Sequence, residues 1–301
     1  MMMRSLLPLL LGAVMLPAAM DSAHANPFSA SSNHSFLERR DIPNLNSAAF
    51  VVANHRTGEV LSEHNGNRVM PIASLTKLMT ALVVLDANQR LNETLTVTNA
   101  DVDRIKGTGS RLAIGSKLSR AEMLHIALMS SENRAASALG RNYPGGLRAV
   151  VEAMNAKARM LGMWNTHYAD STGLNPRNVS TAQDLAKLAA AAAAYPLIRQ
   201  YSTDDQSYVR TNKSQLHYRN SNRLVREGQW EFTLSKTGYI REAGRCLVLG
   251  TRVNNEPVIM VLLNAETTND RVADAKRIKT WLESSGRTTL AANQSSMLTH
   301  Q

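Results

Sequence analysis

Three short motifs in this chain combine hydroxyl, amine and amide side chains at spacings that could support catalysis. In chain order they are Ser74-x-x-Lys77, Ser131-Glu132-Asn133 and Lys236-Thr237-Gly238. Together they supply a hydroxyl nucleophile, an amine to act as its base, a second hydroxyl to transfer a proton, and a cation to hold a carboxylate. Each motif is short enough to occur by chance, so the complete set carries more weight than any one member.

Ser74 and Lys77 lie three residues apart at the start of a predicted helix. Residues three apart share a helix face, so the amine of Lys77 can take the proton of the Ser74 hydroxyl. The neighbours Leu75, Leu78 and Met79 are apolar, which predicts that Lys77 is partly desolvated and therefore a better base near neutral pH. Taken alone, the pattern also fits an ordinary surface helix.

Ser131 and Asn133 flank a single residue and point to the same side if the segment turns. The Ser131 hydroxyl could then relay protons, and the Asn133 amide could hold a substrate carbonyl. The alternative is a pair of polar residues at the end of a helix.

The third motif, Lys236-Thr237-Gly238, closes a predicted strand. Because Gly238 has no side chain, a substrate could approach the backbone there and pair with it like an added strand. Lys236 could then neutralise a terminal carboxylate. The backbone N–H groups of Ser74 and Tyr239 are the expected donors to an oxyanion.

Predicted strands lie near both ends of the chain, and predicted helices lie between them. The strands span residues 48–52, 59–61, 232–237, 246–253 and 258–264. The helices span residues 75–87, 119–130, 146–161, 182–194 and 270–284. This order predicts an α/β chain of the α+β type, with one antiparallel sheet of N- and C-terminal strands packed against a helical block in a single domain.

Longer strings around the motifs make a family resemblance specific. They are ASLTKLMT at residues 73–80, DSTGL at 170–174, STAQDLA at 180–186 and KTGY at 236–239. Over roughly residues 45–285 the chain resembles the serine D-Ala-D-Ala peptidases, the low-molecular-mass penicillin-binding proteins. The resemblance implies a β-lactamase/transpeptidase-like fold and acyl-enzyme chemistry on peptidoglycan stem peptides, with β-lactam antibiotics as covalent inhibitors.

The resemblance also implies a role for each motif residue. It implies catalytic roles for Ser74, Lys77 and Ser131, and substrate binding by Asn133, Lys236, Thr237, Gly238 and Tyr239. The chain departs from the family at Glu132, where many members have Gly. This carboxylate could tune Lys77 or simply face solvent.

A serine β-lactamase of the same fold is one alternative. Class A β-lactamases carry Glu-x-x-Leu-Asn, whose Glu is the accepted deacylation base. The nearest string here runs from Asp170 through Leu174 to Asn175, so the acid is an Asp and lies one residue too far away. A penicilloyl-enzyme should therefore persist.

The C-terminal layout narrows the choice within the family. Members that act as carboxypeptidases commonly continue into a second β domain and an amphipathic membrane anchor. The stretch after Gly238 is too short for both, and residues 286–301 form a polar tail, so no stable membrane anchor is expected. The layout resembles the family's D-alanyl-D-alanine endopeptidases, which cut cross-links between stem peptides. The sequence is also compatible with a carboxypeptidase and with a non-catalytic wall-binding scaffold.

The first 25 residues have the pattern of an export signal. Arg4 is followed by an apolar run over residues 6–16 and by the small-x-small site Ala23-His24-Ala25. Cleavage near Ala25 would leave an extended lead-in at residues 26–45, before a peptidase domain at 46–285. The expected location is the periplasm.

The charge distribution and the lack of metal-site and phosphate-loop motifs argue against nucleic-acid binding and against a cofactor. The net charge of +10 suits a polyanion, but export and the scattered basic residues argue against nucleic acid. No H-x-x-x-H pair predicts a metal site, and no glycine-rich loop predicts a phosphate cofactor, so no cofactor is expected. The one cysteine, Cys246, lies in an apolar run and is expected to be a small buried side chain.

Overall fold

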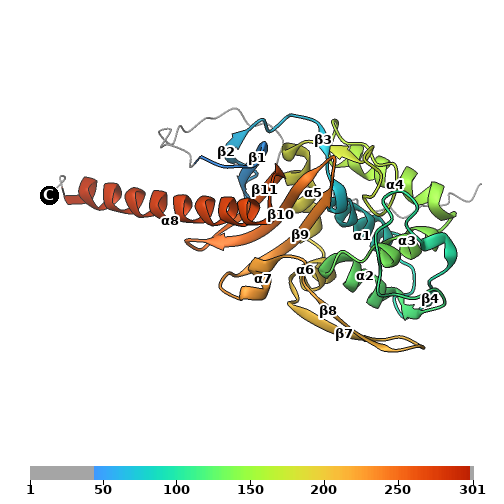
Figure 1. The fold of residues 1–301 in the computed structure, drawn as a ribbon. Helices are drawn as coiled ribbons and strands as arrows, with labels where there is room; N and C mark the ends of the chain where they lie inside the picture. The colour runs from blue at the N-terminus through green and yellow to red at the C-terminus, as the bar shows by residue number, and fades with distance from the viewer. Residues whose placement is uncertain (1–43, 299–301) are drawn as a thin grey trace, which may run out of the picture.

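A computed structural model describes residues 44–298. Its centre is a five-stranded antiparallel sheet with the strand order β2-β1-β11-β10-β9 (Figure 1). The strands span Ala49–Asn54 (β1), Val60–His64 (β2), Phe232–Ile240 (β9), Gly244–Val253 (β10) and Glu256–Ala265 (β11). The predicted sheet, formed from the two ends of the chain, is confirmed.

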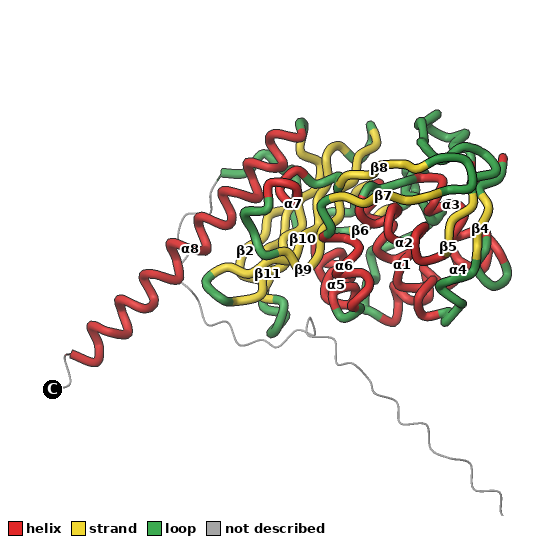
Figure 2. Tube along the Cα trace, turned by 90° about the horizontal axis from the view of Figure 1, so that it is seen from below, coloured by secondary structure: helices red, strands yellow, loops and turns green. Residues whose placement is uncertain are grey.

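Side-chain alternation buries both faces of this sheet. On one face Val51, Val248 and Ile259 belong to a large core shared with the helical block. On the other face Phe50, Leu247 and Met260 form a second core with residues of helix α8 (Thr268–Leu298). Since successive strand residues point to opposite faces, these continuously apolar strands are what a sheet covered on both sides requires. The molecule therefore has three layers, with α8 and the helical block on opposite sides of the sheet (Figures 1 and 2).

The helical block comes from the middle of the chain. Helix α1 (Thr76–Asp86) runs through its centre with most side chains buried. Ser119 and Glu122 form the expected capping box at the start of α2, each bonding the other's backbone N–H. The remaining helices are α2 (Arg120–Met129), α3 (Asn133–Arg141), α4 (Gly146–Met160), α5 (Ala182–Ala193), α6 (Pro196–Thr203) and α7 (Arg223–Glu227).

The part of the chain that forms the helical block also contains short strands and two 3₁₀ turns. Three two-stranded sheets pair β3 (Met70–Pro71) with β6 (Val179–Ser180), β4 (Thr94–Thr96) with β5 (Lys117–Ser119), and β7 (Gln206–Arg210) with β8 (Gln215–Arg219). The 3₁₀ turn η1 (Ala73–Leu75) precedes α1, and the 3₁₀ turn η2 (Asn99–Asp101) follows β4.

Several element boundaries differ from the sequence-based expectations. Pro196 does not only close the alanine-rich helix but begins α6, because proline fits the first helical turn. Strand β9 continues through Gly238 to Ile240, so the third motif lies within the strand. Helix α8 runs to Leu298 instead of ending near residue 284, so most of the expected polar tail is helical. The expected signal peptide and nearly all of the lead-in lie outside the described residues.

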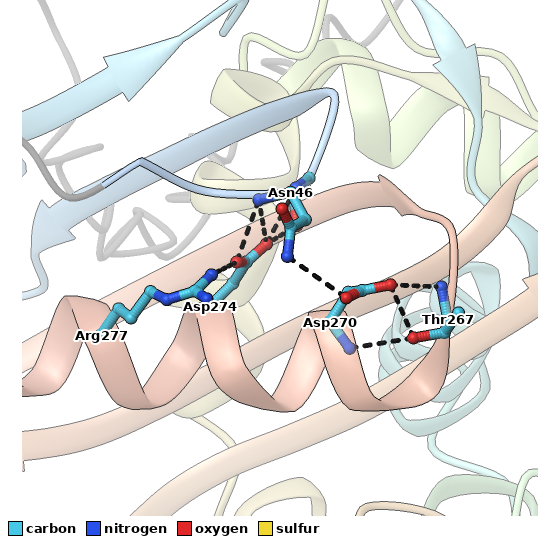
Figure 3. Close-up of polar contacts among 6 residues, drawn as sticks. Asn46, Thr267, Asp270, Asp274 and Arg277 are labelled. Carbon is cyan, nitrogen blue, oxygen red and sulfur yellow. Dashed lines mark hydrogen bonds and ion pairs between the residues drawn. The ribbon is translucent and has the colours of Figure 1, made fainter.

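The start of the described chain is fastened to α8 by one buried carboxylate (Figure 3). Asp274, which is fully buried, accepts hydrogen bonds from the backbone N–H groups of Asn46 and Ser47 and from the Ser47 hydroxyl. Arg277 also contacts its Oδ1 atom at 3.1 Å. Nearby, Thr267 and Asp270 cap the start of α8. The segment before β1 is thereby held against the last helix.

None of the helices between residues 44 and 298 is long and apolar enough to cross a bilayer.

We expect Asp274→Ala to lower the free energy of unfolding by about 3 kcal/mol, because it leaves several buried donors without an acceptor. Thermal or urea unfolding monitored by circular dichroism measures the change. The matched control is Glu256→Ala, which removes an exposed ion pair with Arg56 and should leave the free energy of unfolding nearly unchanged. Equal losses from the two variants would contradict the structural role of Asp274.

Candidate active site

Ser74 lies in η1, immediately before α1. A hydrogen bond of 2.9 Å joins its Oγ atom to the Nζ atom of Lys77. The preceding residue, Ala73, has a φ of 48°, an unusual conformation for a residue with a side chain. This local kink places Ser74 at the helix start with its hydroxyl against the lysine amine.

The Lys77 amine connects three segments of the chain. Besides Ser74, its Nζ atom contacts Oδ1 of Asn133 at 2.9 Å and the carbonyl oxygen of Thr172 at 2.6 Å. Only 1% of Lys77 is exposed, and this burial lowers the pKa of the amine to about 8, against the opposing charges of Asp170, Glu132 and Asp103. An appreciable fraction of the amine is therefore neutral near pH 7 to 8 and able to accept a proton.

Ser131 occupies the junction between α2 and α3 with a φ of 62°. Such a left-handed conformation is strained for a non-glycine residue and is often found at functional sites. Asn133 begins α3, and its Nδ2 atom donates to the hydroxyl of Thr108 at 2.9 Å. Within the described chain, no hydrogen bond joins the Ser131 hydroxyl to Ser74, Lys77 or Lys236. The structure thus brings Ser74, Lys77 and Asn133 into direct contact, with Ser131 in the adjoining turn.

Glu132 does not face solvent. Its carboxylate is buried and accepts hydrogen bonds from the Ser110 hydroxyl at 2.7 Å, the backbone N–H of Arg134 at 3.1 Å and the Tyr218 hydroxyl at 3.4 Å. It therefore caps the start of α3 and fastens the loop that carries Ser110. Its charge also favours the protonated form of Lys77. The sequence left open whether Glu132 tunes Lys77 or faces solvent. The structure supports the first role, because the carboxylate is buried and its charge acts on Lys77.

The third motif lies on the edge strand of the sheet. Lys236 is buried and donates to the carbonyl oxygen of Thr237 at 2.9 Å. The pKa of Lys236 falls well below its usual value, first because of burial and then because Lys77 and Arg271 are nearby cations. Thr237 shares a 2.7 Å hydrogen bond with Ser221. The backbone of β9, with no strand on its outer side, can accept an added strand.

Two glycines make room for the backbone around Ser74. A Cβ atom on Gly238 would lie 3.0 Å from the carbonyl oxygen of Ile72 and 3.2 Å from the nitrogen of Ser74. A Cβ atom on Gly173, whose φ is 83°, would lie 2.0 Å from the carbonyl oxygen of Ala73. The space at Gly238, expected to admit a substrate, is therefore occupied by the segment that carries Ser74.

The Asp170 carboxylate organises its own loop. It accepts hydrogen bonds from the Asn178 amide at 2.7 Å, from the backbone N–H of Gly173 at 3.0 Å and from the Thr172 hydroxyl. These bonds fix the carbonyl of Thr172 that faces Lys77. No hydrogen bond in the described structure links Asp170 to Ser74. The carboxylate is therefore not placed as a general base toward the hydroxyl.

Sequence reasoning missed Arg271, a buried residue near the start of α8. Its NH1 atom donates to the carbonyl oxygen of Cys246 at 3.1 Å, while its Nε atom is buried without a partner. Neither Lys236 nor Arg271 forms an ion pair with a carboxylate among the described residues. Two neighbouring buried cations without a counter-ion favour the binding of an anion. No local motif marks Arg271, whose place depends on the packing of α8.

Among residues 44–298, no cluster of three or more His, Cys, Asp or Glu side chains could hold a metal ion. Cys246 is buried, as expected, and burial raises the pKa of its thiol to about 11, which makes it unreactive.

The chain is similar to several known proteins over most of its length. The profile of the family described as D-alanyl-D-alanine carboxypeptidase, Peptidase_S11, matches residues 37–267. A D-alanyl-D-alanine endopeptidase of Pseudomonas aeruginosa is 47% identical over 250 residues, which are 82% of this chain and 81% of that protein. An endopeptidase of the same name from Escherichia coli is 45% identical over 80% of this chain and 78% of its own.

A solved structure resembles most of the described fold. The Streptomyces K15 DD-transpeptidase superposes with a TM-score of 0.74 at 27% sequence identity. The match covers 80% of this chain and 98% of that one.

We expect Gly173→Ala to disrupt the segment around Ser74, because its Cβ atom would meet the Ala73 carbonyl at 2.0 Å and its backbone would be strained. The variant should lose more than about 2 kcal/mol of unfolding free energy. Gly109→Ala is the control, since no atom lies within 4 Å of its added Cβ. Urea unfolding measures both, and an unchanged midpoint for Gly173→Ala would contradict the close approach.

Proposed function

This chain belongs to the D-alanyl-D-alanine carboxypeptidase family of peptidases, and we propose that it is a serine DD-peptidase that opens peptidoglycan cross-links by way of an acyl-enzyme on Ser74. The observation that carries the proposal is the Ser74–Lys77 contact, in which a buried amine of lowered pKa lies 2.9 Å from the hydroxyl. A nucleophile hydrogen-bonded to its base is the arrangement that acyl transfer requires.

Acylation begins when Ser74 Oγ attacks the carbonyl carbon of a D-alanyl bond. Neutral Lys77 accepts the hydroxyl proton as the new C–O bond forms. The backbone N–H groups of Ser74 and Tyr239 stabilise the oxyanion, and Ser131 passes a proton from Lys77 to the leaving amine as the C–N bond breaks. Water then attacks the ester and releases the acyl group, which restores the Ser74 hydroxyl.

Binding of the substrate uses the edge strand β9 and the start of α3. The peptide pairs along β9, where Thr237 and Tyr239 lie, and Asn133 holds the amide that precedes the scissile bond. Lys236 and Arg271 attract the carboxylate of the leaving amino acid, because neither cation has a counter-ion among the described residues. The carboxylate end of the substrate therefore lies toward Lys236, and the acyl donor extends past Tyr239.

Three competing functions are less well supported. The Asp170 carboxylate accepts hydrogen bonds from Asn178, Gly173 and Thr172. It is therefore not placed to deacylate a β-lactam as the Glu of a class A β-lactamase does. A non-catalytic scaffold would not need a desolvated lysine against a serine hydroxyl. The endopeptidase assignment, in preference to a carboxypeptidase, follows the names of two similar relatives.

Export to the periplasm follows from the predicted signal at residues 1–25.

We expect Ser74→Ala to lower the hydrolysis of purified cross-linked muropeptides by about 10⁴-fold or more, because the acyl-enzyme cannot form. Chromatography of the products, with free pentapeptides as a parallel substrate, separates cleavage of cross-links from removal of terminal D-Ala. Covalent labelling by a fluorescent penicillin should also disappear. Cleavage or labelling that survives in Ser74→Ala would refute the mechanism.

The pKa of Lys77 predicts the pH dependence. Since neutral Lys77 is the base, kcat/KM should rise about tenfold per pH unit on the acid side and level off near pH 8. Lys77→Arg, which stays protonated, should lose about 10²- to 10⁴-fold in rate. Circular dichroism across the same pH range controls for unfolding. A profile that is already flat from pH 6 upward would rule out Lys77 as the base.

A further inference from the structure

Three arginines gather where the chain passes from the β7–β8 hairpin into α7. Arg219 ends β8, and Arg223 and Arg226 lie on α7. Arg219 and Arg223 are exposed, and Arg226 is partly buried. The pKa of Arg226 falls below its usual value, first because of burial and then because of the charges of Arg219 and Arg223. The three guanidinium groups, called the arginine cluster below, therefore lie close enough to repel one another.

The protein neutralises this cluster only in part. Glu227 pairs with Arg223 at 3.1 Å, but the same carboxylate also pairs with Lys276 of α8 at 3.3 Å. Arg226 donates to a backbone carbonyl and has no ion pair among the described residues. Arg219 forms neither an ion pair nor a side-chain hydrogen bond with any described residue. The surface therefore keeps a net positive charge, which attracts an anion.

The arginine cluster adjoins the third motif. Two residues after Arg219, the hydroxyl of Ser221 is joined to that of Thr237 at 2.7 Å. The next residue, Asn222, donates from its amide to the Ser235 hydroxyl at 3.1 Å. These two hydrogen bonds fix the chain between β8 and α7 against the part of β9 that carries Lys-Thr-Gly. Figure 1 shows the β7–β8 hairpin and α7 on the same side of the molecule as β9.

Positive charge extends from the active site to this surface. Lys236 and Arg271 are buried neighbours, since the charge of Arg271 contributes to the lowered pKa of Lys236. Arg223 donates to the side-chain oxygen of Asn269 at 3.3 Å, and Asn269 precedes Arg271 by two residues in α8. The arginine cluster is therefore the exposed continuation of the cationic site that holds the substrate carboxylate.

The direction of the substrate leads its leaving half toward the cluster. In the proposed function the acyl donor extends past Tyr239, and the carboxylate end lies toward Lys236. The chain beyond the scissile bond then leaves the site near Ser235, beside Asn222. In a cross-link this chain is a second peptide with its own carboxylates, whereas in a free pentapeptide it is a single D-Ala. Guanidinium groups bind carboxylates through paired N–H donors, so a peptide that passes here meets matching partners.

We propose that the arginine cluster binds the carboxylates of the leaving peptide and thereby favours cross-links over free pentapeptides as substrates. The inference rests on the proposed function, because that function fixes the direction of the leaving half. It makes Arg219 and Arg223 determinants of substrate specificity. Neither residue touches the reacting atoms, so acylation of Ser74 by penicillin does not depend on them.

The first test compares a defined cross-linked dimer with a free pentapeptide. Arg219→Gln should lower the ratio of the two kcat/KM values, dimer over pentapeptide, by about two- to fivefold, and Arg219→Gln/Arg223→Gln by about tenfold, as expected for exposed charged contacts. Labelling by a fluorescent penicillin should stay at the wild-type rate. The control, Arg68→Gln/Arg90→Gln, removes the same charge at exposed positions outside the cluster and should leave the ratio unchanged.

The second test changes the substrate instead of the protein. Amidation of the carboxylates on the leaving peptide should lower kcat/KM about tenfold in the wild type but less than threefold in Arg219→Gln/Arg223→Gln. Added salt should weaken cleavage of the unmodified dimer more in the wild type than in the double variant, because salt screens exposed charges.

Two results would overturn the inference. One is a ratio of dimer to pentapeptide values that stays constant in the double variant, and the other is equal sensitivity of both proteins to amidation. Failure of the proposed function has a different signature, because the wild type would then cleave neither substrate and would not be acylated by penicillin at Ser74.

Discussion

The structure around the nucleophile depends on the burial of one amine. Lys77 can be desolvated because Ser74, Asn133 and the Thr172 carbonyl surround its Nζ atom and satisfy its hydrogen bonds. An amine so enclosed costs free energy when it is charged, and this cost is what lowers its pKa. Each partner belongs to a different segment, so the position of this single atom requires η1, α3 and the 169–174 loop to be correctly placed together.

Much of the surrounding structure can be understood as support for that arrangement. Gly173 and Gly238 allow two segments to touch the backbone beside Ser74. Asp170 and Asn178 hold the loop that presents the Thr172 carbonyl, and Glu132 caps the helix that presents Asn133. Their chemistry resembles that of an active site, yet the bonds they make are internal.

The sequence alone predicted the sheet, the central helices and the three motifs, because these have local signals. Apolar runs separated by turn residues identified the strands, and the Ser119–Glu122 pair identified the start of α2. Helix α3 was missed because it has only nine residues and begins directly after a strained turn at Ser131. Arg271 and Asn178 were missed for a different reason. Their roles arise from contacts with residues that are distant in sequence, and no motif in the neighbouring residues indicates them. The neighbours of Gly238 could not be predicted, because a missing side chain does not reveal which segment occupies the space beside it.

The position of β1 between β2 and β11 in the sheet has a kinetic consequence. Its partner on one side is β2, a near neighbour in sequence, but on the other side it is β11, which pairs Ala49 with Leu263. Contacts between such distant residues form slowly, because a long loop must close before they can stabilise anything. The sheet cannot be completed until the chain has been synthesised as far as β11, so β1 lacks this partner until then. Such an order of assembly suits the proposed export, in which the chain passes through a membrane before it folds.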